Sequence, residues 1–120
     1  MQRFIENGDN TITDTKTNLI WTKNTVANVD FDDAEKAVAE LGDGWRLPTR
    51  QELESILDLS RHDPAIDTDK FPDTKRNYYW TSTPCAWRAS GVWVVPFGSG
   101  SVLGYDRYDY GCVRAVRSGR

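Results

Sequence analysis

The last third of the chain constrains the fold most strongly, because strings of aromatic and β-branched residues alternate there with residues that follow no hydrophobic period. We call three such strings the frame: Tyr79–Pro84, Val92–Val95 and Val113–Arg117. Strings of this composition are typical of buried strands. The stretch Leu103–Cys112 has neither a strand period nor a helix period. We therefore predict a sheet built from the frame, with the non-frame residues on a contact surface.

Length and composition favour one globular domain over residues 1–120, since the chain has five Trp and 28% charged residues. A domain of this size buries roughly two-thirds of the surface that its unfolded chain exposes, so its core needs no cross-links. No apolar run approaches the roughly 20 residues that span a bilayer, and Met1–Glu6 is not a signal peptide. We expect no membrane insertion; the localisation stays open, and a place on a cell or virion surface would require a carrier.

Charge is distributed unevenly along the chain. Residues 1–75 hold nine Lys/Arg and sixteen Asp/Glu, whereas residues 76–120 hold six Arg and two Asp, which gives −7 and +4. A cationic C-terminal part favours an anionic ligand, and the alternative is ordinary solvated surface charge. Because no Lys/Arg cluster occurs, we expect no nucleic-acid partner.

Neither a metal nor a cofactor is predicted. Cys85 and Cys112 are too few for a disulfide scaffold and lack metal-ligand spacing, and the only histidine, His62, has no nucleophile motif beside it. Four loop carboxylates offer calcium as an alternative to solvated side chains, although their spacing matches no dedicated calcium loop. They belong to Asp63, Asp67, Asp69 and Asp73.

The first half of the chain predicts short strands followed by a helix. Apolar runs alternate with turn residues at Phe4–Ile5, Thr11–Thr13 and Leu19–Trp21, and a polar loop follows to Val29. Asp30 is placed to cap a helix that runs through Leu41, with an apolar stripe toward the core and Gly42 as its left-handed stop.

The second half begins with another predicted helix. Thr49 and Glu52 have the spacing of a capping box, and the helix should end near Ser60. A loop from Arg61 to Arg76 should be held by Ile66 and Phe71. The fold class is therefore α+β. The remaining strands are expected near Tyr79–Ser82, Val92–Phe97, Gly100–Leu103 and Cys112–Val116.

Several large side chains inside these strings have alternative roles. We expect Trp45, Trp80 and Trp93 to pack in the core, as large aromatic residues within motifs usually do. Arg46 and Arg114 would either recognise an anionic group or satisfy buried carbonyls and pair with a carboxylate.

The order of these motifs resembles the C-terminal domain family of the Legionella collagen-like adhesin, within the C-type lectin fold group. The resemblance covers nearly the whole chain. It is carried by Asn7–Asp14, Leu19–Trp21, Gly44–Thr49 with Glu52–Leu53, Pro64–Asp67 with Phe71–Pro72, Tyr79–Thr83 and Val113–Arg117.

The resemblance implies a C-type lectin fold in which the first and last strands pair and two helices flank small antiparallel sheets. It also implies a ligand face in the C-terminal third and a protein or glycan partner on a target surface. The fold group includes formylglycine-generating enzymes, which need an active-site cysteine pair. Cys85 and Cys112 are the only candidates and both occupy positions that look replaceable, so we expect no enzyme activity.

The same fold group contains the variable proteins of diversity-generating retroelements, whose C-terminal segment is rewritten by adenine-directed mutagenesis. Such mutation of an AAC codon cannot produce Lys, Glu, Gln, Met or Trp. From Cys85 to Cys112 the chain has no Lys, Glu, Gln or Met, although its other parts contain five Lys, five Glu, two Gln and Met1. This composition favours a diversified segment, in which Trp87 and Trp93 would belong to the scaffold.

We therefore predict a non-enzymatic binding protein whose C-terminal face, about residues 85–112, is diversified. Tyrosines with charged neighbours suit an adaptable binding surface, and the alternative is a polar hairpin. Two other functions stay open: a fixed-specificity adhesin domain for a glycan or sulfated polysaccharide, and a structural fibre-tip module. The oligomeric state is not predicted. The candidate ligand-binding residues are Cys85, Trp87, Arg88, Ala89, Pro96, Gly98, Ser99, Ser101, Leu103, Tyr105, Asp106, Arg107, Tyr108, Asp109, Tyr110 and Cys112.

Overall fold

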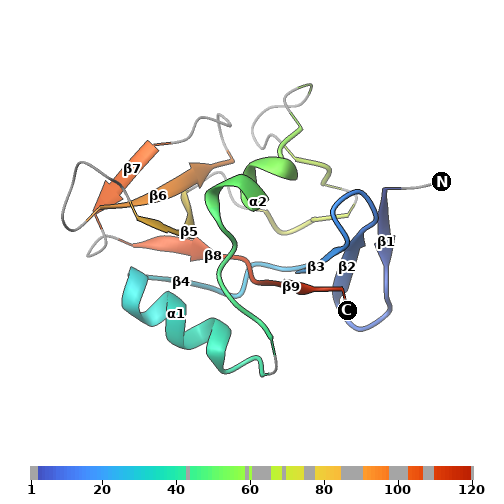
Figure 1. Cartoon of the computed structure of the whole chain (residues 1–120), viewed down its shortest axis with the longest axis horizontal. Helices are drawn as coiled ribbons and strands as arrows, with labels where there is room; N and C mark the ends of the chain where they lie inside the picture. Colours follow the sequence, from blue (N-terminus) through green and yellow to red (C-terminus); the bar gives the residue numbers. More distant parts are fainter. Residues whose placement is uncertain are drawn as a thin grey trace.

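The computed structural model describes most of the chain. It covers residues 3–42, 44–58, 60, 66–68, 70–74, 78–84, 91–97, 103–106 and 110–119, of which 103–106 are described by their backbone. Within these residues the chain forms a four-stranded sheet, a five-stranded sheet and two helices, which confirms the α+β class. The two sheets lie toward opposite ends of the long axis (Figure 1).

The four-stranded sheet joins the beginning of the chain to its end. Its antiparallel order is β1 (Phe4–Glu6), β2 (Thr11–Asp14), β3 (Leu19–Thr22) and β9 (Val116–Ser118). The first and last strands were expected to pair, but they are the two edges of this sheet. β9 pairs with β3 instead, because this register brings the buried Trp21 opposite the buried Val116, whereas β1 is mostly exposed.

The five-stranded sheet holds the frame. Its order is β4 (Ala27–Val29), β8 (Gly111–Val113), β5 (Tyr78–Pro84), β6 (Gly91–Pro96) and β7 (Leu103–Asp106). The β5–β8 pair is parallel and the others are antiparallel, so the prediction of purely antiparallel sheets is wrong for this pair.

Three strand predictions need correction. The expected polar loop to Val29 contains β4, which the indole of Trp80 holds by donating a hydrogen bond to the Val29 carbonyl at 2.9 Å. The expected strand Cys112–Val116 is two strands, β8 and β9, because the chain crosses between the sheets at Arg114 and Ala115. The strand expected at Gly100–Leu103 corresponds to β7 (Leu103–Asp106), which runs past the expected end to Asp106; residues 100–102 lie outside the described residues.

The two helices begin where their caps predicted. α1 (Phe31–Ala39) starts at the Asp30 cap, whose carboxylate accepts the Asp33 amide at 3.0 Å. It ends two residues before the predicted Leu41, which is 42% exposed and does not join the buried stripe. Gly42 has the expected left-handed conformation, at φ 101°.

α2 (Arg50–Ser55) has the predicted capping box between Thr49 and Glu52. It ends five residues before Ser60, because the hydroxyl of Ser55 donates to the Glu52 carbonyl and Ile56 leaves helical geometry with ψ at 0°.

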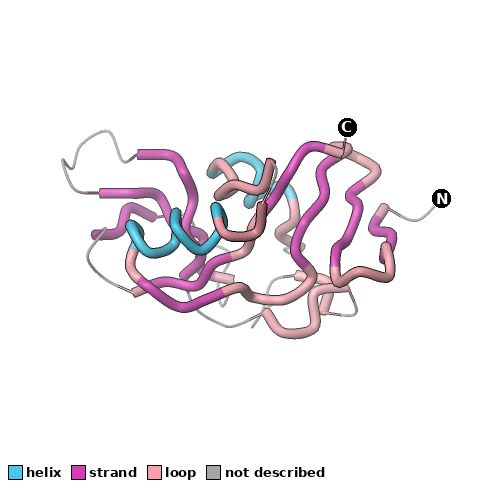
Figure 2. The backbone as a smooth tube through the Cα atoms, turned by 90° about the horizontal axis from the view of Figure 1, so that it is seen from below, coloured by secondary structure: helices cyan, strands magenta, loops and turns pink. Residues whose placement is uncertain are grey.

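The five-stranded sheet is buried on both faces. α1 covers one face, where Phe31 and Val38 pack with Trp80, Val94 and Val113. The other face lies under α2 and the loop anchored by Ile66 and Phe71, as the sequence predicted for that loop. In Figure 2 one helix crosses in front of the sheet and the other lies behind it. Burial on both sides explains why β6 is a continuous apolar run.

Arg114 is the largest charged side chain in the core and is fully buried. Its guanidinium donates to the carbonyls of Thr22 at 2.7 Å and Lys23 at 2.8 Å, and to the hydroxyl of Thr74 at 2.9 Å. It also lies 4.9 Å from the centre of the Phe71 ring. Burial lowers the pKa of Arg114, whereas the nearby Tyr79 raises it. The alternative in which Arg114 satisfies buried carbonyls is confirmed.

Arg46 is exposed and forms a two-pronged ion pair with Glu52, with both N–O distances at 2.7 Å. Burial of the Glu52 carboxylate raises its pKa, but the hydrogen bonds from Arg46 and Thr49 outweigh burial and lower the pKa below its ordinary value. Arg46 therefore pairs with a carboxylate, which was one of its two expected roles.

The tryptophans divide into two groups. Trp80 is fully buried, as predicted. Trp45 and Trp93 are only half-buried, so the prediction that they are core residues is wrong in part. Each carries an arginine over its ring, Arg117 over Trp45 at 5.2 Å and Arg50 over Trp93 at 4.5 Å. An arginine covers an aromatic ring while keeping its own charge in water, which explains the intermediate burial.

We predict that Arg114→Ala lowers the free energy of unfolding by about 3–5 kcal/mol, since two buried carbonyls lose a charged donor. The matched control is Arg46→Gln, which breaks a partly exposed ion pair and should cost about 1 kcal/mol or less. Urea unfolding followed by circular dichroism measures both variants. Equal losses would contradict a central role for Arg114.

We predict that Trp80→Ala lowers the free energy of unfolding by about 3–5 kcal/mol. Trp45→Ala should cost about 1–2 kcal/mol, because only part of its ring leaves water on folding. Thermal melts of the two variants, recorded side by side, provide the comparison. A larger loss at Trp45 than at Trp80 would assign Trp45 to the core after all.

Candidate ligand-binding face

The candidate ligand-binding residues fall into three groups by location. Those that lie outside the described residues are Cys85, Trp87, Arg88, Ala89, Gly98, Ser99, Ser101, Arg107, Tyr108 and Asp109. A second group occupies β7, and a third lies on β6 and at the start of β8.

The β7 group forms the edge of the five-stranded sheet. Its backbone pairs with β6 in an antiparallel register that brings Leu103 opposite Val94, Tyr105 opposite Val92 and Asp106 opposite Gly91. β7 has one neighbour in the sheet and lies at the end of the molecule away from both chain termini (Figure 1). The stretch without a hydrophobic period therefore begins on an edge strand.

The third group is divided between surface and core. Tyr110 is 66% exposed and precedes β8 directly. The side chains of Cys112, which is 1% exposed, and Pro96 are buried, so they do not reach the surface. Cys112 packs with Tyr79 and Val95. Among these three residues, only Tyr110 exposes its side chain to solvent.

Gly111 marks where the exposed stretch ends. A Cβ atom at this position would lie 2.8 Å from Nε1 of the buried Trp80, closer than van der Waals contact permits. The Trp80 ring is held by its hydrogen bond to Val29 and by an edge contact with Phe31 at 5.6 Å, so it has little room to move. Position 111 therefore belongs to the scaffold although its neighbour Tyr110 is exposed.

Most of the frame is buried; the exceptions are the end of β5, where Ser82 and Pro84 are exposed, and Thr83, Trp93 and Arg117, which are half-buried. Tyr79, Trp80 and Thr81 of β5 are fully buried, and the hydroxyl of Thr81 donates to the Trp93 carbonyl at 2.6 Å, which ties β5 to β6. Val94, Val95, Val113, Ala115 and Val116 are fully buried as well.

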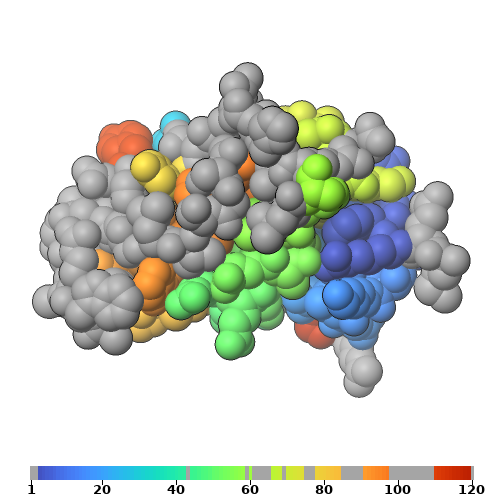
Figure 3. All heavy atoms as spheres, turned by 90° about the horizontal axis from the view of Figure 1, so that it is seen from above, coloured from blue at the N-terminus to red at the C-terminus, as the bar shows by residue number. Residues whose placement is uncertain are grey.

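Trp93 and Arg50 are surface residues beside β7 that the sequence reasoning missed. Trp93 pairs in register with Gly104 of β7, and the Arg50 guanidinium lies over its ring. The amide of Arg50 also donates to the hydroxyl of Thr83 at 3.0 Å. Figure 3 shows the α2 residues on the surface between the N-terminal strands and β6.

The signal for Trp93 was present in the strand alternation. Val92 and Val94 pack against α1, so Trp93 faces the other side of the sheet, where α2 covers only part of it.

The described residues offer no cluster of three or more His, Cys, Asp or Glu that would hold a metal ion. Of the four proposed calcium ligands, Asp63 and Asp69 lie outside the described residues. The Asp73 carboxylate accepts the Thr25 amide at 2.8 Å, and the Asp67 carbonyl accepts the Phe71 amide at 2.9 Å. The helices of the described chain are too short and too polar to cross a membrane.

The comparison with known families gives a match over most of the chain. A sequence model of the Lcl C-terminal domain matches residues 10–117, which span β2 to β9 and include the whole frame. No curated protein matches the chain in sequence. The chain therefore belongs to the Lcl C-terminal domain family, that of the Legionella collagen-like adhesin.

Proposed function

We propose that this chain is a non-enzymatic, adhesin-like binding domain of C-type lectin fold whose C-terminal face carries a diversified ligand site. One observation carries the proposal: most of the frame is buried, while the stretch Leu103–Tyr110 begins on the edge strand β7 and ends at the exposed Tyr110. Substitutions on an edge strand and its flanks leave the core intact. Such a division suits a protein that keeps one fold and changes its ligand.

The C-type lectin fold is supported by the way the two ends of the chain meet. β9 returns from the five-stranded sheet to pair with β3, so the chain begins and ends in one sheet. Two helices cover opposite faces of the other sheet. Membership of the Lcl C-terminal domain family is consistent with this fold.

The chemistry of the proposed face favours protein or glycan ligands. A tyrosine presents a large ring and a hydroxyl while losing little rotamer entropy, and charged neighbours orient the ligand. Tyr105 lies on β7, and Tyr110 exposes its ring two residues before Cys112. Trp93, beneath Arg50, adds a fixed aromatic surface beside β7.

The absence of enzyme activity is part of the proposal. A thiol oxidase of the formylglycine-generating kind requires two accessible cysteines, and Cys112 is buried within β8. A thiol that is 1% exposed is not accessible to a substrate. This burial supports binding rather than catalysis.

Diversification by a retroelement is the finer part of the proposal. It is supported by the missing Lys, Glu, Gln and Met between Cys85 and Cys112 and by the edge position of β7. The alternative is a fixed adhesin site for a glycan or sulfated polysaccharide, which the +4 charge of residues 76–120 favours. Arg114 is buried, so it does not contribute to such a site. Binding that falls steeply with added salt would support the alternative.

We predict the effect of a triple variant in which Ser replaces Tyr105, Tyr108 and Tyr110. Its melting temperature should shift only slightly. On a printed glycan array it should no longer bind the glycans that the unmodified chain binds. The matched control is Tyr79→Ser, which removes a fully buried ring and should unfold the domain or lower its melting temperature strongly. Collapse of the triple variant would identify its tyrosines as core residues. Unchanged binding by a folded triple variant would contradict the assigned face.

We also predict where natural substitutions accumulate. The 3′ end of the gene, sequenced from many individuals of the source population, should vary at the codons for residues 85, 98–99 and 103–110, whereas the codons of the buried Pro96 and Cys112 should vary little. Codon 111 should remain glycine, because any side chain there meets Trp80. Substitutions scattered evenly over frame and non-frame codons would argue for a fixed ligand and against diversification.

A further inference from the structure

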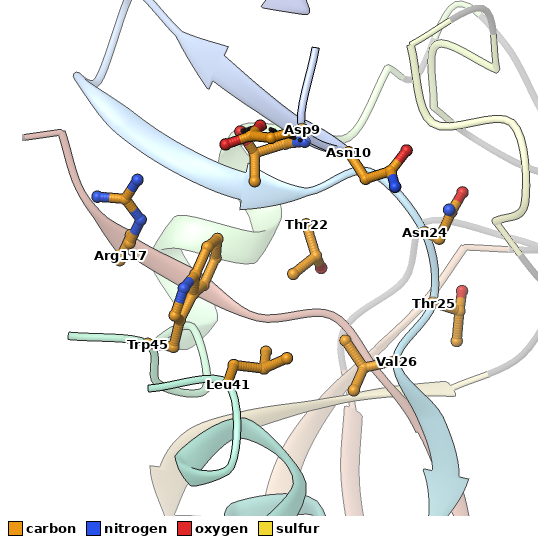
Figure 4. A pocket seen from close by; sticks show the side chains of 10 residues that line it. Asp9, Asn10, Thr22, Asn24, Thr25, Val26, Leu41, Trp45 and Arg117 are labelled. Carbon is orange, nitrogen blue, oxygen red and sulfur yellow. Dashed lines mark hydrogen bonds between the residues drawn. The ribbon is translucent and has the colours of Figure 1, made fainter. Parts of the chain in front are cut away.

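A pocket of about 460 Å³ lies far from β7, between the four-stranded sheet and the end of α1. Two turns of the N-terminal sheet contribute Asn10 and Asn24 to its rim, the loop after α1 contributes Leu41 and Trp45, and β9 contributes Arg117. Figure 4 shows these side chains around a common hollow. Its volume falls in the range of small-molecule sites, about 300–1,000 Å³.

Trp45 forms a fixed aromatic wall of this pocket. Its backbone is held beside β9 because Arg46 and Val116 exchange two amide–carbonyl hydrogen bonds of 3.0 Å each. In Figure 4 the Trp45 ring lies between Arg117 on one side and Leu41 and the pocket on the other. Arg117 covers the ring at 5.2 Å. The opposite side of the ring is left for a ligand with an apolar face.

Two amide side chains on the rim are available for hydrogen bonds. Asn10 and Asn24 make no side-chain hydrogen bond within the described part of the chain. The turn that carries Asn10 is nevertheless rigid: the Asp9 carboxylate accepts the Thr11 amide at 3.2 Å, and the Asn10 carbonyl accepts the Lys23 amide at 2.9 Å. The Asn10 backbone has φ 66°, in the left-handed region.

The charges around the pocket balance. Asp9 and Arg117 are the charged residues among those that line it. The hydrogen bond from Thr11 lowers the pKa of Asp9, so its carboxylate is ionised at neutral pH and offsets the guanidinium of Arg117. A ligand with a net charge gains little from a lining that is neutral overall.

We propose that this pocket binds one ring of a neutral pyranose sugar. A pyranose has an apolar face of C–H groups that packs on Trp45, and its hydroxyls both donate and accept hydrogen bonds, as do the amides of Asn10 and Asn24. The Asp9 carboxylate accepts from a further hydroxyl. This site shares no residue with the proposed C-terminal face, so the inference is independent of the proposed function.

The test is a titration of ¹⁵N-labelled full chain, followed by two-dimensional NMR. The probes are methyl β-D-galactopyranoside, methyl α-D-mannopyranoside and N-acetylglucosamine at millimolar concentrations, with sodium glucuronate as the charged counterpart. The Trp45→Phe variant lacks the Trp45 indole N–H peak, so comparing its spectrum with that of the unmodified chain assigns this peak. We expect at least one neutral sugar to shift the Trp45 indole peak and the side-chain amide peaks of Asn10 and Asn24, while Trp93 and Tyr110 stay unchanged.

The double variant Asn10→Gly with Asn24→Ala should raise the Kd for that sugar about tenfold, because two hydrogen bonds are lost. Glycine preserves the left-handed backbone at position 10. The melting temperature should stay unchanged, since neither side chain has a hydrogen-bond partner among the described residues. Asn28→Ala on the exposed face of β4 is the matched control and should leave binding unchanged.

Three results would overturn the proposal. The first is no movement of the Trp45 peak with any of the neutral sugars. The second is preferred binding of glucuronate that Arg117→Gln abolishes, which would identify an anion site. The third is sugar-induced shifts at Trp93 or Tyr110 instead, which would assign the sugar to the C-terminal face.

Discussion

The buried guanidinium of Arg114 joins the two sheets, and much of the architecture depends on it. An unpaired buried charge would cost several kcal/mol, and three oxygens accept hydrogen bonds from the two terminal nitrogens of Arg114 while the Phe71 ring lies against its guanidinium. The carbonyls belong to Thr22, the last residue of β3, and to Lys23 directly after it, and the Thr74 hydroxyl comes from the loop beneath the five-stranded sheet. One side chain thereby fixes the point where the chain crosses from β8 to β9.

This crossing determines what is left for binding. Because β9 returns to β3, the ends of the chain close the four-stranded sheet, and β7 remains as an edge of the other sheet at the far end of the molecule. Both faces of the five-stranded sheet are already covered, so stability comes from β5, β6 and β8. At β8, by contrast, Gly111 has no room for a side chain, because a Cβ atom there would lie 2.8 Å from Nε1 of Trp80.

Local signals in the sequence predicted the local structure. The caps at Asp30 and Thr49 and the anchors Ile66 and Phe71 were predicted correctly, because each depends on a side chain's own chemistry. Strand partners were predicted less well. β4 was predicted as part of a polar loop because its pairing partner, β8, lies far along the chain and leaves no local signal at residues 27–29. β9 was assigned to the wrong neighbour for the same reason. The candidate face was predicted from a stretch that lacks any hydrophobic periodicity. Such a stretch does not reveal which of its residues are buried, so the burial of Cys112 was not predicted.

The two half-buried tryptophans show why burial could not be predicted from motifs alone. Trp45 and Trp80 both lie within motif strings, yet Trp80 is fully buried beneath α1, while Trp45 lies at the margin of the same core cluster with Arg117 over its ring. An arginine that stacks on a ring protects one face and leaves the other for contact. The same arrangement recurs with Arg50 and Trp93 beside β7. The fold thus has an arginine-covered tryptophan next to each sheet, Trp45 beside β9 and Trp93 on β6, and the two pairs share no residue.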